Sequence, residues 1–210
     1  MPAKANGLKI PRHFTESGKD PFDKLSWSKK DVEIRNFDGT VAFSMKGVTL
    51  PDNYSQVASN VLAQKYLRKA GVPNKLRKVK EKAVPSWLQK SIPDLKAMDG
   101  LPESEKYGEE VDGKQTFRRL AGTWTYWGWK NGYFASEADA KSYFDEMCFM
   151  LAFQMVSPNS PQWFNTGLNW AYGIEGPAQG HYFVNSKTGD LERSVNAYEH
   201  PQPHACFIQS

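Results

Sequence analysis

The residues with the clearest chemical potential in this sequence are a histidine and a cysteine two positions apart, His204 and Cys206. Pro201 and Pro203 precede them, and because each proline restricts φ and removes an amide donor, this approach is stiff and extended. The short apolar run that contains Cys206 predicts the start of a buried strand. On a strand both side chains would face the same side, so His204 could lower the pKa of the Cys206 thiol and prepare it for nucleophilic attack or redox exchange. The alternative is an inert, buried strand cysteine, and these residues alone favour it.

A metal site is a weaker possibility for the same segment. His200 and His204 have a spacing found among metal ligands, but the prolines between them prevent the helix that would put both on one face. One nearby thiolate does not complete a site, so we expect no metal. The sequence also has no glycine-rich phosphate loop of the Walker or dinucleotide type.

A second candidate is the segment 157–167, in which Pro158 and Pro161 lie among small hydroxyl and amide side chains. Two prolines three residues apart prevent a preceding helix from continuing, so the segment is predicted to be a loop. Such a loop can hold backbone and hydroxyl groups in a fixed arrangement, which suits hydrogen bonding to a small polar ligand. An ordinary turn explains the same composition equally well.

Composition limits the class of protein. The 210 residues include only two cysteines, Cys148 and Cys206, which excludes a disulfide scaffold and fits a reducing compartment. The N-terminus has no secretory apolar region, and no stretch approaches 18 apolar residues, so we expect a cytoplasmic protein that does not enter a membrane. A net charge of +4 does not by itself imply nucleic acid.

The first half of the chain is predicted to contain an irregular arm, a hairpin and a helix. Residues 1–30 form the arm, anchored by Phe14, Phe22 and Trp27, although a loosely ordered terminus is an equal alternative. Residues 31–50 alternate around an Asp-Gly pair and predict a hairpin. A helix follows from a Ser55 cap to about residue 70.

The region 74–112 mostly predicts loop, with a possible short helix over 84–92. Its basic run, 75–82, is best explained as a solvated face, and a phosphate-contacting patch is the alternative. The period predicts a helix over 114–129, where the tryptophan-rich stretch 124–129 is expected to pack in the core rather than stack on a ligand.

A further helix is predicted from a Ser136 cap to about residue 156, with Met155 among the residues on its apolar side and Cys148 as a buried, inert thiol. Residues 168–197 resemble an insertion with a hairpin formed by 182–184 and 191–193.

Several segments together resemble adenosylcobalamin-dependent (class II) ribonucleotide reductase, and most closely its long bacterial form. The resemblance extends from about residue 8 to the end and covers only the N-terminal part of such a protein. The segments that carry it are Gln56–Tyr66, Leu120–Lys130, Ser157–Gly167 and Tyr198–Ser210, the last reading YEHPQPHACFIQS.

This resemblance implies a fold and a chemistry. The fold would be mainly α with small β-hairpins, followed by the first strand of a ten-stranded α/β barrel that this chain enters and does not complete. In the family, a cobalamin-derived radical reaches a cysteine on a central loop, and two further cysteines reduce the ribonucleotide and close to a disulfide. Cys206 matches the first of these reductant cysteines. Ser160 matches a hydroxyl residue that contacts substrate, and Ala205 with Cys206 matches a pair that borders the nucleotide.

The resemblance also implies that several functional residues of the family lie outside this chain. The radical cysteine, the second reductant cysteine and most contacts to adenosylcobalamin match no residue here, so the chain is expected to be a fragment that is inactive alone. We expect Cys148 and Cys206 not to meet the separation of about 7 Å that a disulfide requires. The implied partners are the ribonucleotide substrate, the missing C-terminal portion, a thioredoxin-type reductant and a second copy of the full enzyme.

The implied division of the chain is 1–30 as the arm, 31–156 as a hairpin with a helical domain, and 157–210 as substrate loop, hairpin insertion and barrel entry. The alternative from another class of protein is a stand-alone helical module that binds nucleic acid or another partner, with the basic run 75–82 as its contact surface.

Overall fold

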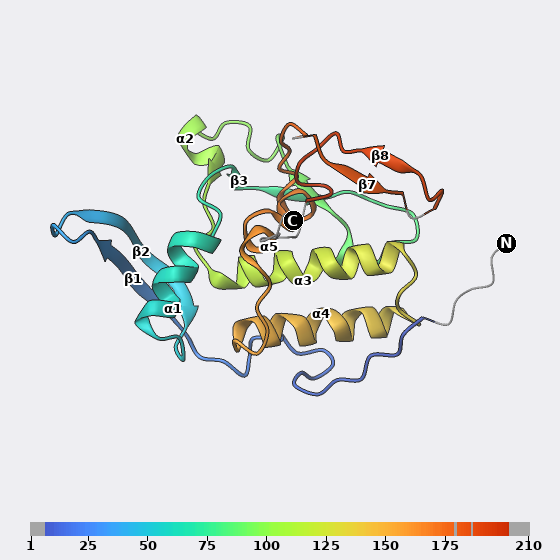
Figure 1. The fold of residues 1–210 in the computed structure, drawn as a ribbon, viewed down its shortest axis with the longest axis horizontal. Helices are drawn as coiled ribbons and strands as arrows, with labels where there is room; N and C mark the ends of the chain where they lie inside the picture. The colour runs from blue at the N-terminus through green and yellow to red at the C-terminus, as the bar shows by residue number, and fades with distance from the viewer. Residues whose placement is uncertain (1–6, 179, 186, 202–210) are drawn as a thin grey trace, which may run out of the picture.

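The structure is a computed structural model that describes residues 7–178, 180–185 and 187–201. Two long helices lie side by side at its centre, with a long hairpin at one end and a short hairpin above the first helix (Figure 1). Within the described ranges the strands form two-stranded antiparallel sheets and no closed barrel. The predicted first barrel strand, with Ala205 and Cys206, lies outside the described residues.

The two central helices are α3 (Gly113–Lys130) and α4 (Glu137–Ala152). A capping box begins α3, where Gln115 Oε1 accepts a hydrogen bond from the backbone N–H of Asp112 at 3.0 Å. The predicted Ser136 cap of α4 is confirmed, since Ser136 Oγ accepts from the backbone N–H of Asp139 at 3.2 Å. These caps satisfy backbone donors that a helix start leaves unpaired.

The predicted C-terminal end of α4 is wrong. The helix stops at Ala152, and Gln154 adopts a positive φ of 61°, which turns the chain out of the helix. Met155, expected on the apolar side, is therefore 46% exposed. The prediction was too long because the apolar pattern continues past Ala152, where the helix ends.

The predicted hairpin is confirmed and is longer than expected. It consists of β1 (Trp27–Arg35) and β2 (Val41–Pro51), paired antiparallel around a turn in which Gly39 has a φ of 85°. Because β1 begins at Trp27, the irregular arm ends before residue 30. Val32 and Val48 are buried and attach one face of the hairpin to the helices.

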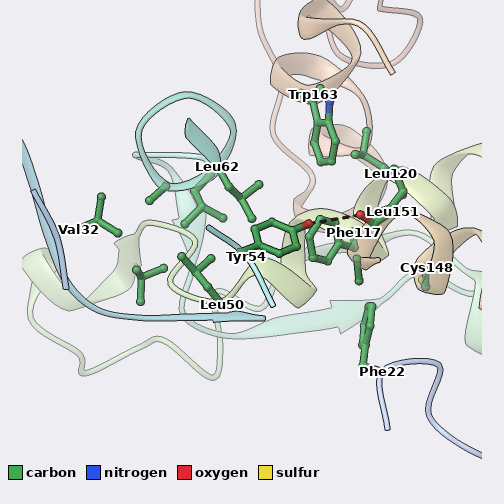
Figure 2. Packing of buried hydrophobic residues seen from close by; sticks show 14 of the residues in the cluster. Phe22, Val32, Leu50, Tyr54, Leu62, Phe117, Leu120, Cys148, Leu151 and Trp163 are labelled. Carbon is green, nitrogen blue, oxygen red and sulfur yellow. Dashed lines mark hydrogen bonds between the residues drawn. The ribbon is translucent and has the colours of Figure 1, made fainter. Parts of the chain in front are cut away.

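One hydrophobic core joins the arm, the hairpin and both central helices (Figure 2). Its labelled members are Phe22, Val32, Leu50, Tyr54, Leu62, Phe117, Leu120, Cys148, Leu151 and Trp163. The Tyr54 hydroxyl donates to the Leu151 carbonyl at 3.4 Å, so even the phenol oxygen at the centre of this core has a partner. Cys148 is fully buried, as predicted.

The predicted arm lies on α4 through specific contacts. Phe14 stacks on Phe149 with ring centroids 5.3 Å apart, and Arg12 forms an ion pair with Asp145 at 2.8 Å. The arm anchors Phe22 and Trp27 meet edge to face at 5.3 Å. Over residues 7–26, the arm is therefore a packed segment rather than a loose terminus.

The predicted helix over 55–70 is only partly correct. Ser55 caps α1 (Gln56–Val61), accepting from the Ala58 N–H at 3.1 Å, but the chain then widens into a π-helix, η1 (Leu62–Tyr66). Extended backbone begins at Leu67, because the next amide, that of Arg68, donates to a buried carboxylate instead of a helical carbonyl. A tertiary contact ends this helix.

The region 74–112 contains more regular structure than predicted. Only three residues of the possible helix over 84–92 are helical. The elements are β3 (Val72–Pro73) paired with β6 (Tyr107–Gly108), β4 (Leu76–Lys78) paired with β5 (Ser91–Pro93), the 3₁₀ helix η2 (Ser86–Leu88), and α2 (Glu103–Lys106).

The segment after α4 corrects two further predictions. The predicted loop 157–167 contains a short helix, α5 (Ser160–Asn165), in which Pro161 occupies the first turn, where a missing N–H is tolerated. A second helix, α6 (Leu168–Tyr172), packs against α3, so these residues are part of the core rather than an insertion. The predicted hairpin of β7 (Tyr182–Val184) and β8 (Leu191–Arg193) is confirmed.

Candidate functional site

Ser160 is the one substrate-contacting residue of the sequence prediction that the structure describes. It is the first residue of α5, and its neighbour Asn159 caps that helix by accepting from the Gln162 N–H at 3.4 Å. Ser160 is partly exposed, and its hydroxyl lies 3.3 Å from the hydroxyl of Tyr66. Its oxygen is therefore held by a neighbouring side chain.

A groove of about 400 Å³ is lined by Tyr66, the residue whose hydroxyl contacts Ser160, although Ser160 itself does not line it. We call it the Tyr66 groove, because Tyr66 both lines it and contacts the serine. Leu62, Leu151 and Trp163 form apolar walls, and Ser157 adds a second hydroxyl. The Tyr66 and Trp163 rings stack with centroids 5.0 Å apart, which fixes the wall nearest to Ser160. The groove has the volume of a small-molecule site.

A buried ion pair holds the backbone on both sides of this groove. Arg119 of α3 is 1% exposed and Glu110 is fully buried, and Arg119 Nε donates to Glu110 Oε1 at 2.8 Å. The remaining guanidinium nitrogens donate to two backbone carbonyls, that of Thr166 at 2.8 Å and that of Tyr66 at 3.0 Å. One side chain thus connects the end of η1 to the end of α5, which positions Tyr66 relative to Ser160.

The Glu110 carboxylate also accepts hydrogen bonds from three donors other than Arg119. Its carboxylate accepts from the Thr116 hydroxyl at 2.8 Å, the Tyr172 hydroxyl at 2.7 Å and the Arg68 N–H at 2.8 Å. Burial by itself would raise the pKa of Glu110, but Arg119 and these donors together hold that pKa below its ordinary value. The pair is therefore charged and rigid at neutral pH.

Gly167 completes the frame around α5. It adopts a φ of 89°, and a Cβ at this position would lie 2.4 Å from the carbonyl oxygen of Arg119. Only glycine permits both the backbone conformation and the close approach of α3. No local spacing pattern in the sequence marks Gly167 or the Glu110–Arg119 pair, because both act through contacts between separate elements.

The other predicted chemical residues have separate environments or lie outside the described part. Cys206, Ala205 and His204 belong to residues 202–210, which the structure does not describe. Cys148 lies in the core, where burial raises the pKa of its thiol well above the ordinary range. His200 stacks on Phe183 with ring centroids 4.0 Å apart, and burial lowers the pKa of its imidazole.

No group of three or more histidine, cysteine, aspartate or glutamate side chains in the described ranges could hold a metal ion. Among the same residues, no helix is both long enough and apolar enough to cross a membrane.

The basic run is mostly exposed. Within it, β4 contributes Leu76, Arg77 and Lys78, all exposed, and Lys78 folds back to donate to the Gln89 carbonyl at 2.8 Å. This arrangement fits the solvated face that the sequence predicted.

Comparison with known proteins identifies the class. The sequence model described as "Class II vitamin B12-dependent ribonucleotide reductase" matches residues 28–154, which is more than half of the chain. The chain belongs to this family.

Individual relatives agree with this result. Proteins named vitamin B12-dependent ribonucleotide reductase from Bradyrhizobium diazoefficiens and Agrobacterium fabrum are each 57% identical to this chain, over 96% and 97% of its length. A protein of the same name from Rhodopirellula baltica is 27% identical over 97% of it. In all three comparisons the aligned part makes up 16% of the relative, so this chain spans about a sixth of the length of these proteins.

Proposed function

We propose that this chain supplies the N-terminal part of an enzyme that converts ribonucleotides to 2′-deoxyribonucleotides by thiyl-radical chemistry. The main support is the family membership, together with relatives that align along nearly the whole chain. In the proposed division, the arm extends to residue 26, the hairpin with the helical domain extends to residue 156, and 157–210 contain the substrate segment, the second hairpin and the barrel entry.

The proposed role of Ser160 is to contact the ribonucleotide substrate. Ser160 is partly exposed, its hydroxyl contacts Tyr66 of the Tyr66 groove, and a buried ion pair positions the surrounding backbone; these properties suit a group that must meet a polar ligand in a fixed geometry. Ala205 and Cys206 are proposed to border the same nucleotide.

The proposed role of Cys206 is that of a reductant thiol. Its partner would be a cysteine in the portion of the enzyme beyond this chain. The two thiols give up two electrons and two protons, the 2′-hydroxyl leaves as water, and a disulfide forms. A thioredoxin-type protein would then reduce this disulfide, a reaction expected of a cytoplasmic enzyme.

Adenosylcobalamin, which would supply the radical, does not fit the pockets of the described residues. The Tyr66 groove of about 400 Å³ and a second pocket of about 210 Å³ are both too small for a corrin that carries a nucleotide. A broad depression of about 1030 Å³ beside Leu95 and Tyr107 is formed largely by exposed surface residues. We therefore propose that the cofactor is bound mainly by the remainder of the enzyme.

The experiment is reconstitution of the 210-residue chain with the remaining C-terminal portion of the reductase, adenosylcobalamin, a dithiol reductant and a ribonucleotide. The chain alone should form no deoxyribonucleotide, and the mixture should form it. Ser160→Ala should raise the KM for the ribonucleotide, whereas Ser104→Ala on the exposed helix α2 should not.

Turnover by the chain alone, or an unchanged KM in Ser160→Ala, would contradict this assignment. Salt-sensitive binding of DNA by the purified chain, without any recovery of turnover, would instead favour the stand-alone nucleic-acid-binding module.

A further inference from the structure

The hydroxyl of Tyr66 is the polar side-chain group that meets the hydroxyl of Ser160, with 3.3 Å between the two oxygens. Within the described ranges this is the hydrogen bond of both hydroxyls, and neither has a second polar partner there. Both side chains are partly exposed, so neither hydroxyl is enclosed by the core. The direction in which the Ser160 hydrogen points therefore depends on Tyr66.

The ring of Tyr66 is fixed against the same helix that carries Ser160. Trp163 of α5 stacks on it with centroids 5.0 Å apart, and Phe164 of α5 meets it at 5.7 Å with an angle of 41° between the rings. The backbone carbonyl of Tyr66 is held by Arg119 at 3.0 Å. Rotation of the ring would break both aromatic contacts, so the phenol oxygen has a defined position relative to α5.

The backbone that leads to Tyr66 has a geometry that is common at functional sites. The Leu67 N–H donates to the Leu62 carbonyl at 3.1 Å, an i→i+5 bond that makes η1 a π-helix. Such turns are rare and occur frequently at functional sites. In a regular α-helix Tyr66 would share the face of Leu62, which is buried, whereas here Tyr66 is partly exposed and reaches α5.

The chemistry of the two hydroxyls favours one direction for their hydrogen bond. A phenol is the stronger donor because its O–H is more acidic, and an aliphatic alcohol is the better acceptor. When Tyr66 donates to Ser160 Oγ, the serine keeps its own hydrogen for another partner. The separation of 3.3 Å exceeds the usual O–H···O distance of about 2.7–2.8 Å, but functional hydrogen bonds are often long in a free enzyme and shorten when substrate binds.

We propose that Tyr66 is a positioning residue for the substrate contact: it donates to Ser160 Oγ and thereby directs the serine hydrogen toward an acceptor atom of the ribonucleotide. This role rests on the proposed contact between Ser160 and substrate, and it adds the direction of that hydrogen bond and the side chain that sets it. Tyr66 acts through Ser160 and need not touch the substrate. A phosphate, carbonyl or ribose oxygen can accept the serine hydrogen, whereas an exocyclic amino group of a base cannot.

The test measures KM and kcat for the ribonucleotide in the enzyme reconstituted from the 210-residue chain and the remaining C-terminal portion. Tyr66→Phe should raise KM about three- to tenfold with kcat nearly unchanged, because a binding contact is weakened equally before and during the reaction. The double variant Tyr66→Phe/Ser160→Ala should have the KM of Ser160→Ala alone, because no serine hydroxyl remains for the phenol to direct.

A rescue experiment tests the direction of the hydrogen bond. Replacement of Tyr66 by para-aminophenylalanine restores a donor at the same place, while the aniline nitrogen accepts poorly. The KM should therefore return close to that of the unmodified enzyme. Tyr66→Phe also keeps the ring that stacks on Trp163, so its Tm should stay within about 2 °C of that of the unmodified chain.

The matched control is Tyr143→Phe. Tyr143 is a partly buried tyrosine of α4 whose ring packs on Phe134 with centroids 5.4 Å apart, and it does not line the Tyr66 groove. Loss of its hydroxyl should leave KM unchanged. An equal rise in KM for Tyr143→Phe and Tyr66→Phe would overturn the proposal, because the effect would then not be specific to Ser160.

Three further outcomes would overturn the proposal. If Tyr66→Phe leaves KM unchanged while Ser160→Ala raises it, Tyr66 has no positioning role and the proposed substrate contact of Ser160 stands. If the effects add in the double variant, or if para-aminophenylalanine behaves like phenylalanine, Tyr66 does not act by donating to Ser160. An unchanged KM in Ser160→Ala overturns both this role of Tyr66 and the proposed substrate contact.

Discussion

Arg119→Met offers the sharpest test of the framework around Ser160. The substitution keeps the length of the buried side chain but removes the partner of Glu110, together with the donors to the carbonyls of Thr166 and Tyr66. Both charged groups are at most 1% exposed, so water cannot replace the lost partner. Breaking such a buried pair typically lowers the free energy of unfolding by about 3–5 kcal/mol.

The assay is thermal unfolding followed by tryptophan fluorescence. For a chain of this size, 1 kcal/mol corresponds to roughly 2–4 °C in Tm, so Arg119→Met should unfold about 6–20 °C lower than the unmodified chain. The matched control is Arg118→Met, which removes the neighbouring arginine and its exposed ion pair with Asp20. Exposed pairs contribute about 1 kcal/mol or less, so this control should lower Tm by about 4 °C at most.

The pH dependence supplies a second readout of the same pair. In the unmodified chain the pKa of Glu110 is held below 4.5, so its stabilising contribution is present above that pH and is lost as the pH falls through the lowered pKa. In Arg119→Met the cation is gone, so burial dominates and the pKa of Glu110 rises above its ordinary value. Protonation of Glu110 then removes the unpaired buried charge and stabilises the variant. The difference in Tm should therefore narrow as the pH falls from the raised pKa of Glu110 in the variant to its lowered pKa in the unmodified chain.

The double variant Glu110→Gln/Arg119→Met should be more stable than Arg119→Met alone, because no carboxylate remains buried without its cation. The reasoning is refuted if Arg119→Met and Arg118→Met have equal Tm values, or if the double variant is no more stable than the single one.

Three further predictions concern stability and reactivity. Gly167→Ala should lower the free energy of unfolding by more than Gly132→Ala does. Both glycines have a positive φ, but only a Cβ at Gly167 would collide with the Arg119 carbonyl. Equal urea midpoints for the two variants would contradict this prediction. Ser136→Ala should cost about 1 kcal/mol in urea unfolding through loss of the cap on α4, and an unchanged midpoint would show that the cap is dispensable. Cys148 should react with Ellman's reagent only after unfolding, because burial raises the pKa of its thiol, and rapid reaction in native buffer would contradict this core placement.

The sequence predicted best the elements that have a recognisable turn residue, cap residue or apolar period. The Asp-Gly pair predicted the long hairpin, and Ser136 predicted the start of α4. The recurrence of apolar residues every three or four positions predicted α3. The preference for core packing of the tryptophan-rich stretch is confirmed for Trp124, which packs against the main core and donates from its indole N–H to Gln162 at 3.1 Å.

Features that depend on contacts between distant residues could not be predicted. The end of η1 before residue 70 follows from the amide of Arg68 donating to Glu110, a contact across 42 positions. The short helix α5 has Pro161 in its first turn, and a proline in a sequence is equally typical of the place where a helix stops. The frame around Ser160 likewise depends on Glu110 and Arg119, whose ion pair also receives a hydrogen bond from Tyr172 of α6.

The central claim is that Cys206 is a reductant thiol of a ribonucleotide reductase whose N-terminal part is this chain. The direct measurement compares deoxyribonucleotide formed per reconstituted enzyme for Cys206 and Cys206→Ser, with excess reductant and adenosylcobalamin. We predict many turnovers for the unmodified enzyme and loss of multiple turnover for Cys206→Ser. Full multiple turnover by Cys206→Ser would contradict the claim.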